Sequence, residues 1–232
     1  MHIGERLDLH MDPNRMVPNA YLYQALAASR ELLGKDGFAA VIKRAGVILP
    51  VMGQYLDENS WPPADMEPAT PARHFSGIFQ AIEEVGGGRA QMVNIGIRTA
   101  QMGFEGLGPA MKATLSVLKK LPGFQWRAET VLKAMADDLL DASPGDREKQ
   151  AIRVVTDKEK RAILFIDRTG DSCHGRNGVH TPVCHVYRGG IIGAVKLATG
   201  KVARVVETAC MAAGDNACVF EVGFEAEETD ET

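Results

Sequence analysis

The stretch VVETACMAAGDNACVFEV, residues 205–222, decides the fold. Val202–Glu207 and Ala217–Phe224 are rich in β-branched and aromatic residues, and they flank a turn that reads GDN at 214–216. This pattern predicts a β-hairpin. Side chains alternate between the two faces of a strand, so one face of the second strand carries a set of alternate residues. The members of this set are Cys218, Phe220, Val222 and Phe224.

A helix and a second hairpin are predicted upstream of this stretch. Thr181-Pro182 is a typical helix start, with threonine as the N-cap and proline at the first helical position. The helix is expected to run to about Ala198, with Gly200 as its stop. Ala151–Thr156 and Arg161–Arg168 are rich in valine and isoleucine and are separated by a polar run, which predicts another hairpin. The C-terminal part therefore has the order ββαββ.

The first 145 residues have the 3.6-residue periodicity of helices. Residues 50–72, with five prolines, are expected to form an irregular connection. The predicted fold class is α+β, with an antiparallel sheet packed on helices. We divide the chain into a helical part (1–145), a sheet-and-helix part of the same domain (146–225) and an acidic tail (226–232). The predicted helical segments are Ala20–Leu33, Gly37–Ala45, His74–Val85, Ala90–Phe104, the stripe Met111, Thr114, Leu115 and Leu118, and Arg127–Asp141.

Composition excludes several classes of protein. The chain has 232 residues, 45% of them hydrophobic, and a net charge of −4, of which five acidic residues fall in the last eight positions. The remaining body is nearly neutral, which argues against a dedicated nucleic-acid binder. The chain has no uninterrupted apolar stretch of about 18 residues, so no membrane span is expected. The N-terminus, MHIGERLDLHMD, lacks the apolar core of a signal peptide, so we predict a cytoplasmic location.

All four cysteines lie in the last 60 residues, which indicates metal or redox chemistry more than disulfides in a cytosolic chain. The hairpin can bring Glu207, Cys210 and Cys218 to one point, and packing of the preceding helix can add Cys184. A thiol near a helix N-terminus ionises more easily. Three thiolates and one carboxylate form a plausible tetrahedral Zn²⁺ site, and with no open position it would be structural.

Three alternatives stay open at this point. The cysteines can be ordinary buried core residues. The segment CHGRNGVHTPVCH, residues 173–185, combines two cysteines with His174, His180 and His185 and can hold haem or iron. The four cysteines can also hold an iron–sulfur cluster, although their spacing fits none of the common ferredoxin patterns.

Other features indicate binding more than catalysis. The chain has no GxSxG motif, no P-loop and no Rossmann fingerprint, and Gly86-Gly87-Gly88 is predicted to be a helix–helix turn. The glycines Gly189, Gly190 and Gly193 allow close approach of another helix, a ligand or a second subunit. A hydrophobic ligand site, or simply the core, would use the aromatic residues near the helix–sheet junction. These candidates are Phe104, Trp126, Phe165 and Tyr187.

The segments 205–222 and PVCHVYRGGIIGAV, 182–195, resemble the 4-vinyl reductase domain family, and the resemblance covers about 145–225. It implies a hydrocarbon-binding protein with a fold similar to vesicle-tethering subunits. In phenol-sensing members a structural zinc is held by a Cys, a Glu and two Cys, an order that Cys184, Glu207, Cys210 and Cys218 follow, while Cys173 has no counterpart. Where a phenol-gripping Trp would be sought, this chain has Ile163, Leu164 and Phe165, which implies a more apolar ligand.

The resemblance and the residues together support three functional hypotheses. The first is a cytosolic, homodimeric protein that binds a small hydrophobic ligand and contains a structural zinc. The second is a tetrapyrrole-binding or vinyl-reductase-related accessory of (bacterio)chlorophyll synthesis. The third is a scaffold or interaction subunit.

Overall fold

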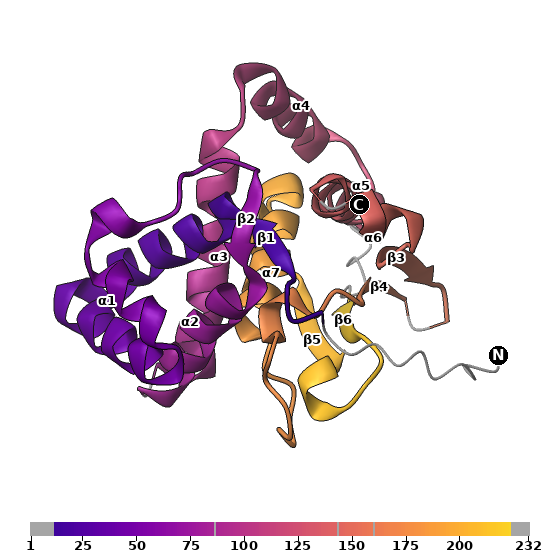
Figure 1. Cartoon of the computed structure of the whole chain (residues 1–232). Coiled ribbons are helices and arrows are strands. Elements are labelled where there is room, and N and C mark those ends of the chain that lie inside the picture. The colour runs from indigo at the N-terminus through magenta and orange to yellow at the C-terminus, as the bar shows by residue number, and fades with distance from the viewer. Residues whose placement is uncertain (1–11, 86, 143, 160, 224–232) are drawn as a thin grey trace.

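The computed structural model describes residues 12–223 except Gly86, Ser143 and Lys160. Helices occupy one side of the molecule and a four-stranded sheet the other, which confirms the predicted α+β class (Figure 1). The N-terminal elements are β1 (Met16–Pro18), α1 (Asn19–Ile48), η1 (Pro50–Leu56), η2 (Glu58–Ser60), β2 (Pro68–Pro71), α2 (Ala72–Glu84), α3 (Gly88–Gly106), α4 (Pro109–Lys120) and α5 (Phe124–Asp141). The later elements are α6 (Pro144–Glu148), β3 (Ile152–Asp157), β4 (Ala162–Asp167), η3 (Asp171–Cys173), α7 (His185–Thr199), β5 (Arg204–Ala209), η4 (Met211–Ala213) and β6 (Cys218–Gly223).

The main sheet has the strand order β3-β4-β6-β5, and every neighbouring pair is antiparallel. Both predicted hairpins are present, and they join through β4 and β6, where Phe165 lies opposite Phe220 and Asp167 opposite Cys218. Burial alternates along β6 as predicted: Cys218, Phe220 and Val222 are buried. Phe224 lies outside the described residues.

Gly34 ends the first helical segment, as the sequence predicted. It adopts a left-handed conformation (φ 68°) that is least costly for glycine, and it kinks α1 between the two predicted helices.

Two local predictions were wrong. Helix α7 begins at His185 and not after Thr181, so Cys184 is its N-cap residue and not a residue of its first turn. The reason is a tertiary contact: the Cys184 N–H donates to the carboxylate of Glu207. Residues 50–72 are not wholly irregular, because β2 pairs with β1 in a small antiparallel sheet. Prolines on both strands hide this pairing from sequence patterns.

Two hydrophobic cores lie on either side of α3 and α7. One joins α1, α2 and η1, with Leu26 and Phe79 at most 1% exposed. The other joins α5, α7 and the sheet, with Leu132 and Phe220 at 0%. Each such side chain contributes about 1.5–3 kcal/mol on burial.

Helices α3 and α7 connect these cores through backbone contact. A Cβ atom added to Gly96 would lie 1.9 Å from the carbonyl oxygen of Val186, and one added to Gly189 would lie 2.1 Å from that of Val93. Further along, Gly193 faces Ala100 in the same way. Because the contacting residue numbers rise together, the helices run parallel with their N-termini at the same end. The predicted close approach at these glycines is therefore packing within the chain.

Among the residues described, no helix combines the length and the hydropathy that crossing a membrane requires.

The crossing of α3 and α7 predicts opposite effects for two neighbouring substitutions. Gly189→Ala should lower the free energy of unfolding by about 3 kcal/mol or more, because the obstructing atom is backbone and cannot rotate away. Gly190→Ala is the matched control: no atom lies within 4 Å of its added Cβ, and alanine is the better helix former, so a gain of up to about 1 kcal/mol is expected. Urea unfolding measures both. Equal stability of the two variants would contradict the crossing.

Candidate metal centre

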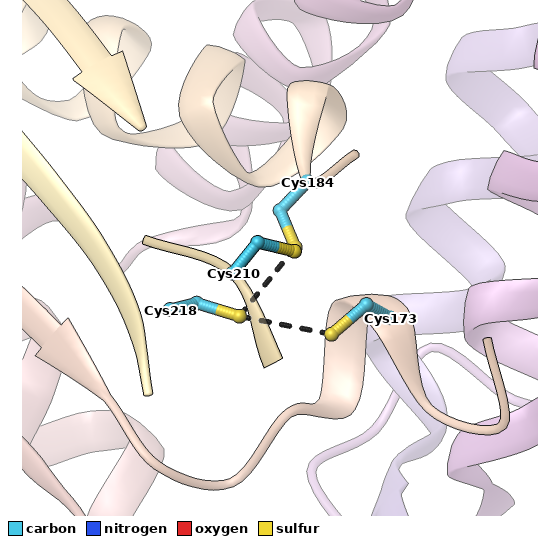
Figure 2. A group of neighbouring side chains, drawn as sticks. All are labelled: Cys173, Cys184, Cys210 and Cys218. Carbon is cyan, nitrogen blue, oxygen red and sulfur yellow. Dashed lines mark hydrogen bonds between the residues drawn. The ribbon is translucent and has the colours of Figure 1, made fainter. Parts of the chain in front are cut away.

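Four buried thiols meet at one point between the sheet and the start of α7. Cys173 comes from η3, Cys184 precedes α7, Cys210 follows β5 and Cys218 begins β6. Their side chains point toward a common centre, and all four sulfur atoms lie within 4.8 Å of one another (Figure 2). Each residue is at most 1% exposed.

The spacing of the sulfur atoms fits a single tetrahedral metal ion. The Sγ atoms are 3.6 Å apart for Cys173 and Cys218, 3.7 Å for Cys184 and Cys218, and 3.8 Å for Cys184 and Cys210. A tetrahedron with Zn–S bonds of about 2.3 Å has edges of about 3.8 Å. These separations are too long for a disulfide bond, and all four cysteines are free. The donor set therefore has the number, softness and spacing that zinc requires.

The turn between β5 and β6 positions two of the thiols. The backbone N–H of Cys210 donates to Asp215 Oδ2 at 2.8 Å, and Gly214 takes the left-handed conformation (φ 100°) that closes the turn. The N–H of Met211 points to the sulfur of Cys218 at 3.5 Å. Such N–H donors stabilise a thiolate. The predicted convergence of Cys210 and Cys218 is present.

Glu207 lies beside the group and orients one of its members. Its Oε2 accepts the backbone N–H of Cys184 at 2.9 Å, while Oε1 is buried and has no hydrogen-bond partner among the described residues. Burial, followed by the charge of Cys210, raises the pKa of Glu207 to about 8. The cluster of four ligand atoms contains Cys173 in the place for which the sequence suggested Glu207.

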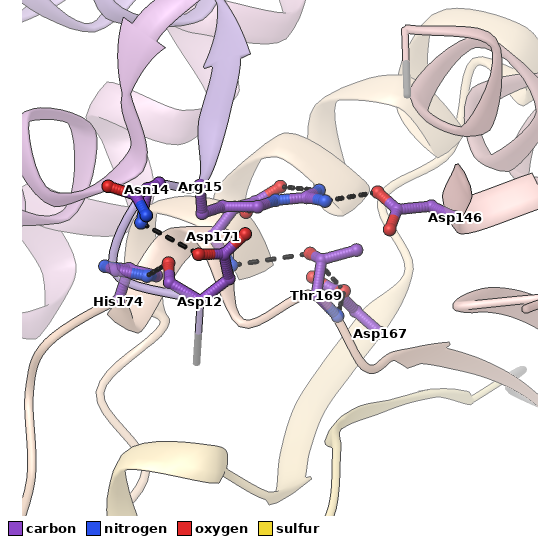
Figure 3. A network of polar contacts seen from close by, with 8 residues as sticks. All are labelled: Asp12, Asn14, Arg15, Asp146, Asp167, Thr169, Asp171 and His174. Atoms are coloured by element: carbon purple, nitrogen blue, oxygen red, sulfur yellow. Dashed lines mark hydrogen bonds and ion pairs between the residues drawn. The ribbon is translucent and has the colours of Figure 1, made fainter. Parts of the chain in front are cut away.

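Cys173 was expected to stand outside the site, and this was wrong. An ion-pair network attaches its 3₁₀ turn to the N-terminal strand (Figure 3). Arg15, before β1, donates from Nε and Nη2 to the two carboxylate oxygens of Asp171 at 2.7 and 2.9 Å, and from Nη1 to Asp146 at 2.5 Å. This two-point bond fixes Asp171, two residues before Cys173.

The two ends of the same loop are also held in place (Figure 3). Asp167 Oδ1 accepts the N–H and the hydroxyl of Thr169 at 2.7 and 2.6 Å, and burial raises the pKa of Asp167 to about 6. On the other side of Cys173, His174 Nε2 lies 2.9 Å from the carbonyl oxygen of Asp12. Residues 156 to 162 positions away in the sequence thus set the place of Cys173.

The thiols control one another's ionisation. Contacts from the thiols of Cys173, Cys184 and Cys218 lower the pKa of Cys210, while thiol contacts and burial raise that of Cys184 well above its usual value. The pKa of Cys218 is raised as well, first by Cys173. One thiol therefore ionises readily and the others resist. A divalent cation removes this resistance, because its charge deprotonates the coordinating thiols.

The predicted ligand-lining residues fall into two groups. Phe165 packs edge-on against Tyr187, with ring centroids 5.9 Å apart, and Tyr187 lies 5.3 Å from Phe220, which the sequence analysis did not include. The alternation along β6 was the signal that could have found Phe220. Phe104 and Trp126 belong to neither hydrophobic core, and Trp126 is 52% exposed.

The histidines predicted as an alternative metal site do not join the cysteines in the described part of the chain. His174 and His185 are buried, whereas His180 is exposed.

Comparison with known proteins identifies the C-terminal part of the chain. One solved structure that matches is the phenol-responsive sensory domain of the transcription activator PoxR with phenol, at 14% identity and a TM-score of 0.33, over 65% of this chain and 72% of that one. No curated protein sequence matches the chain. The model of the 4-vinyl reductase domain matches residues 171–224, the segment that carries all four cysteines. The predicted family relationship is thereby confirmed: residues 171–224 belong to a 4-vinyl reductase domain.

Proposed function

We propose that this protein binds a small hydrophobic molecule and that a structural zinc, held by Cys173, Cys184, Cys210 and Cys218, stabilises the 4-vinyl reductase domain. The observation that supports the zinc is the dry group of four thiols with tetrahedral spacing. With four protein ligands the ion has no open position for substrate, so its role is structural. It joins η3, the start of α7 and the β5–β6 turn.

The spacing also favours one ion over an iron–sulfur cluster. Cysteines bind a cluster from its outside, which places their sulfur atoms further apart than around a single ion. The separations of 3.6–3.8 Å correspond to one shared ion. Glu207 acts in this proposal as the group that orients Cys184, and the set Cys184, Glu207, Cys210 and Cys218 is the alternative.

The proposed ligand region lies where α5 and α7 cover the sheet. Apolar side chains here are only partly buried although they pack against the inner core, so they can take up apolar surface. Tyr187 brings a hydroxyl to this region, and burial raises its pKa well above the usual value, so the hydroxyl stays a neutral donor. The partly buried members on α5, β3 and α7 are Val131, Met135, Leu139, Val154 and Tyr187.

Burial of apolar ligand surface would drive binding at about 25 cal/mol per Å². A cytoplasmic location and a homodimer remain predictions from the sequence. The second candidate function, tetrapyrrole binding by the histidine-bearing loop, remains a prediction too. A Soret band on adding haem would support it.

The four-thiolate site predicts which substitution releases zinc. Wild-type protein purified without added metal should contain about one zinc per chain by elemental analysis. Cys173→Ser should lose most of this zinc and become less stable, because hydroxyl is a poor replacement for thiolate. Glu207→Gln should keep its zinc, since the amide oxygen can still accept the Cys184 N–H.

Cobalt substitution supplies a second readout, because the sulfur-to-cobalt charge-transfer band grows with the number of thiolate ligands. The band should weaken in Cys173→Ser and stay unchanged in Glu207→Gln. The reverse result, with zinc retained in Cys173→Ser and lost in Glu207→Gln, would favour the Glu207 set. Wild-type protein without zinc would remove the metal proposal.

The proposed ligand region predicts where a larger side chain blocks binding. Toluene and phenol serve as probes, and bound ligand should raise the Tm of the wild type. Val131→Trp should abolish that rise, because the indole fills the space between α5 and the sheet, while the Tm without ligand stays within a few degrees. Trp126→Ala, on the same helix but 52% exposed, should respond to ligand like the wild type. A normal ligand response in Val131→Trp would place the site elsewhere.

A further inference from the structure

A second cluster of polar side chains lies at the start of α7 and takes no part in the metal centre. We call it the arginine cluster. Its members come from α7, from the loop before it and from the first turn of α3. They are His185, Arg188, Arg176 and Arg89.

The cluster contains buried nitrogen atoms without partners among the described residues. Both ring nitrogens of His185, which is 4% exposed, lack a hydrogen bond. Nη1 of Arg176, which is 9% exposed, and Nε of Arg188 lack one as well. A buried polar atom without a partner costs about 1–3 kcal/mol, so four such atoms at one place indicate a missing acceptor.

The charges around these atoms are mostly positive. Burial, followed by the charges of Arg188 and Arg89, lowers the pKa of His185, and Arg176 contributes in the same direction. Within the described part of the chain, the carboxylate bound to the cluster is that of Glu83, which accepts from Nη2 of Arg176 at 2.5 Å. Three guanidinium groups thus face one carboxylate, which leaves an excess of positive charge.

The helix ends add to this positive potential. Because α3 and α7 run parallel, the positive ends of both helix dipoles lie on the same side of the molecule. Neither helix has a side-chain N-cap bond or an acidic residue in its first turn. Arg89 and His185 stand there instead, in positions where helices normally favour carboxylates. A bound anion would reverse this unfavourable arrangement.

We propose that the arginine cluster binds a phosphate-type oxyanion, either inorganic phosphate or the phosphate group of a small organic molecule. The free N–H groups at the start of α7 and the guanidinium groups provide the donors that such an anion requires. Arginine suits this anion because its planar donors match two phosphate oxygens at once. The site is separate from the proposed hydrophobic ligand region and does not depend on it.

Isothermal titration of inorganic phosphate into the full chain, at constant ionic strength, tests the proposal. One phosphate per chain should bind with a Kd of about 1 mM or tighter. Arg89→Gln and Arg188→Gln should each weaken binding about tenfold, the effect of one lost charged hydrogen bond. Arg89 is exposed, so its replacement should not disturb folding. Arg204→Gln, an exposed arginine on β5, is the matched control and should bind as the wild type does.

A comparison with phenyl phosphate separates the two sources of the anion. Tighter binding of phenyl phosphate would assign the site to a phosphorylated organic molecule, and equal binding would assign it to the free anion. Two results would overturn the proposal. One is a wild type that does not bind phosphate up to 20-fold above that expected Kd, and the other is binding that neither Arg89→Gln nor Arg188→Gln weakens.

Discussion

The backbone contact between α3 and α7 is the constraint on which the rest of the structure depends. Gly96 and Gly189 let the two helices approach until the backbone of one touches the backbone of the other, and any side chain at these positions would separate them. Since one hydrophobic core lies on each side of this helix pair, its spacing sets the relation between the N-terminal helices and the sheet. The same crossing places the start of α7, with Cys184 and His185, close to the first turn of α3.

The metal centre depends on this frame and on one long-range ion pair. The β5–β6 turn builds half of the site locally, because the Cys210–Asp215 bond and Gly214 fold a short loop back on itself. The other half comes from segments whose places are fixed by distant partners: Glu207 holds Cys184, and Arg15 holds the turn that ends at Cys173. A metal ion here would join four segments that few other contacts connect. This is a reason for a structural ion in a part of the fold with several short, irregular turns.

The two proposed binding regions differ in chemistry because they lie at different parts of α7. Near its start, the helix presents His185 and Arg188 together with unpaired backbone N–H groups, an environment suited to an anion. The side chain of Tyr187 lies between the rings of Phe165 and Phe220, an environment suited to an aromatic or aliphatic molecule. One helix can thus serve both regions, since successive residues point in different directions around its axis.

The sequence by itself determined the elements and their order, because hydrophobic periodicity and turn residues act over a few neighbouring positions. It predicted the hairpins, the buried face of β6, the kink at Gly34 and three of the four clustered cysteines. Only the tertiary structure decided that Cys173 completes the cluster, that α7 starts at His185 and that β2 pairs with β1. In each case the deciding interaction joins residues distant in the sequence: Arg15 with Asp171, Cys184 with Glu207, and Met16 with Pro71. Such contacts depend on how the packed elements lie in space, and no local pattern records that arrangement.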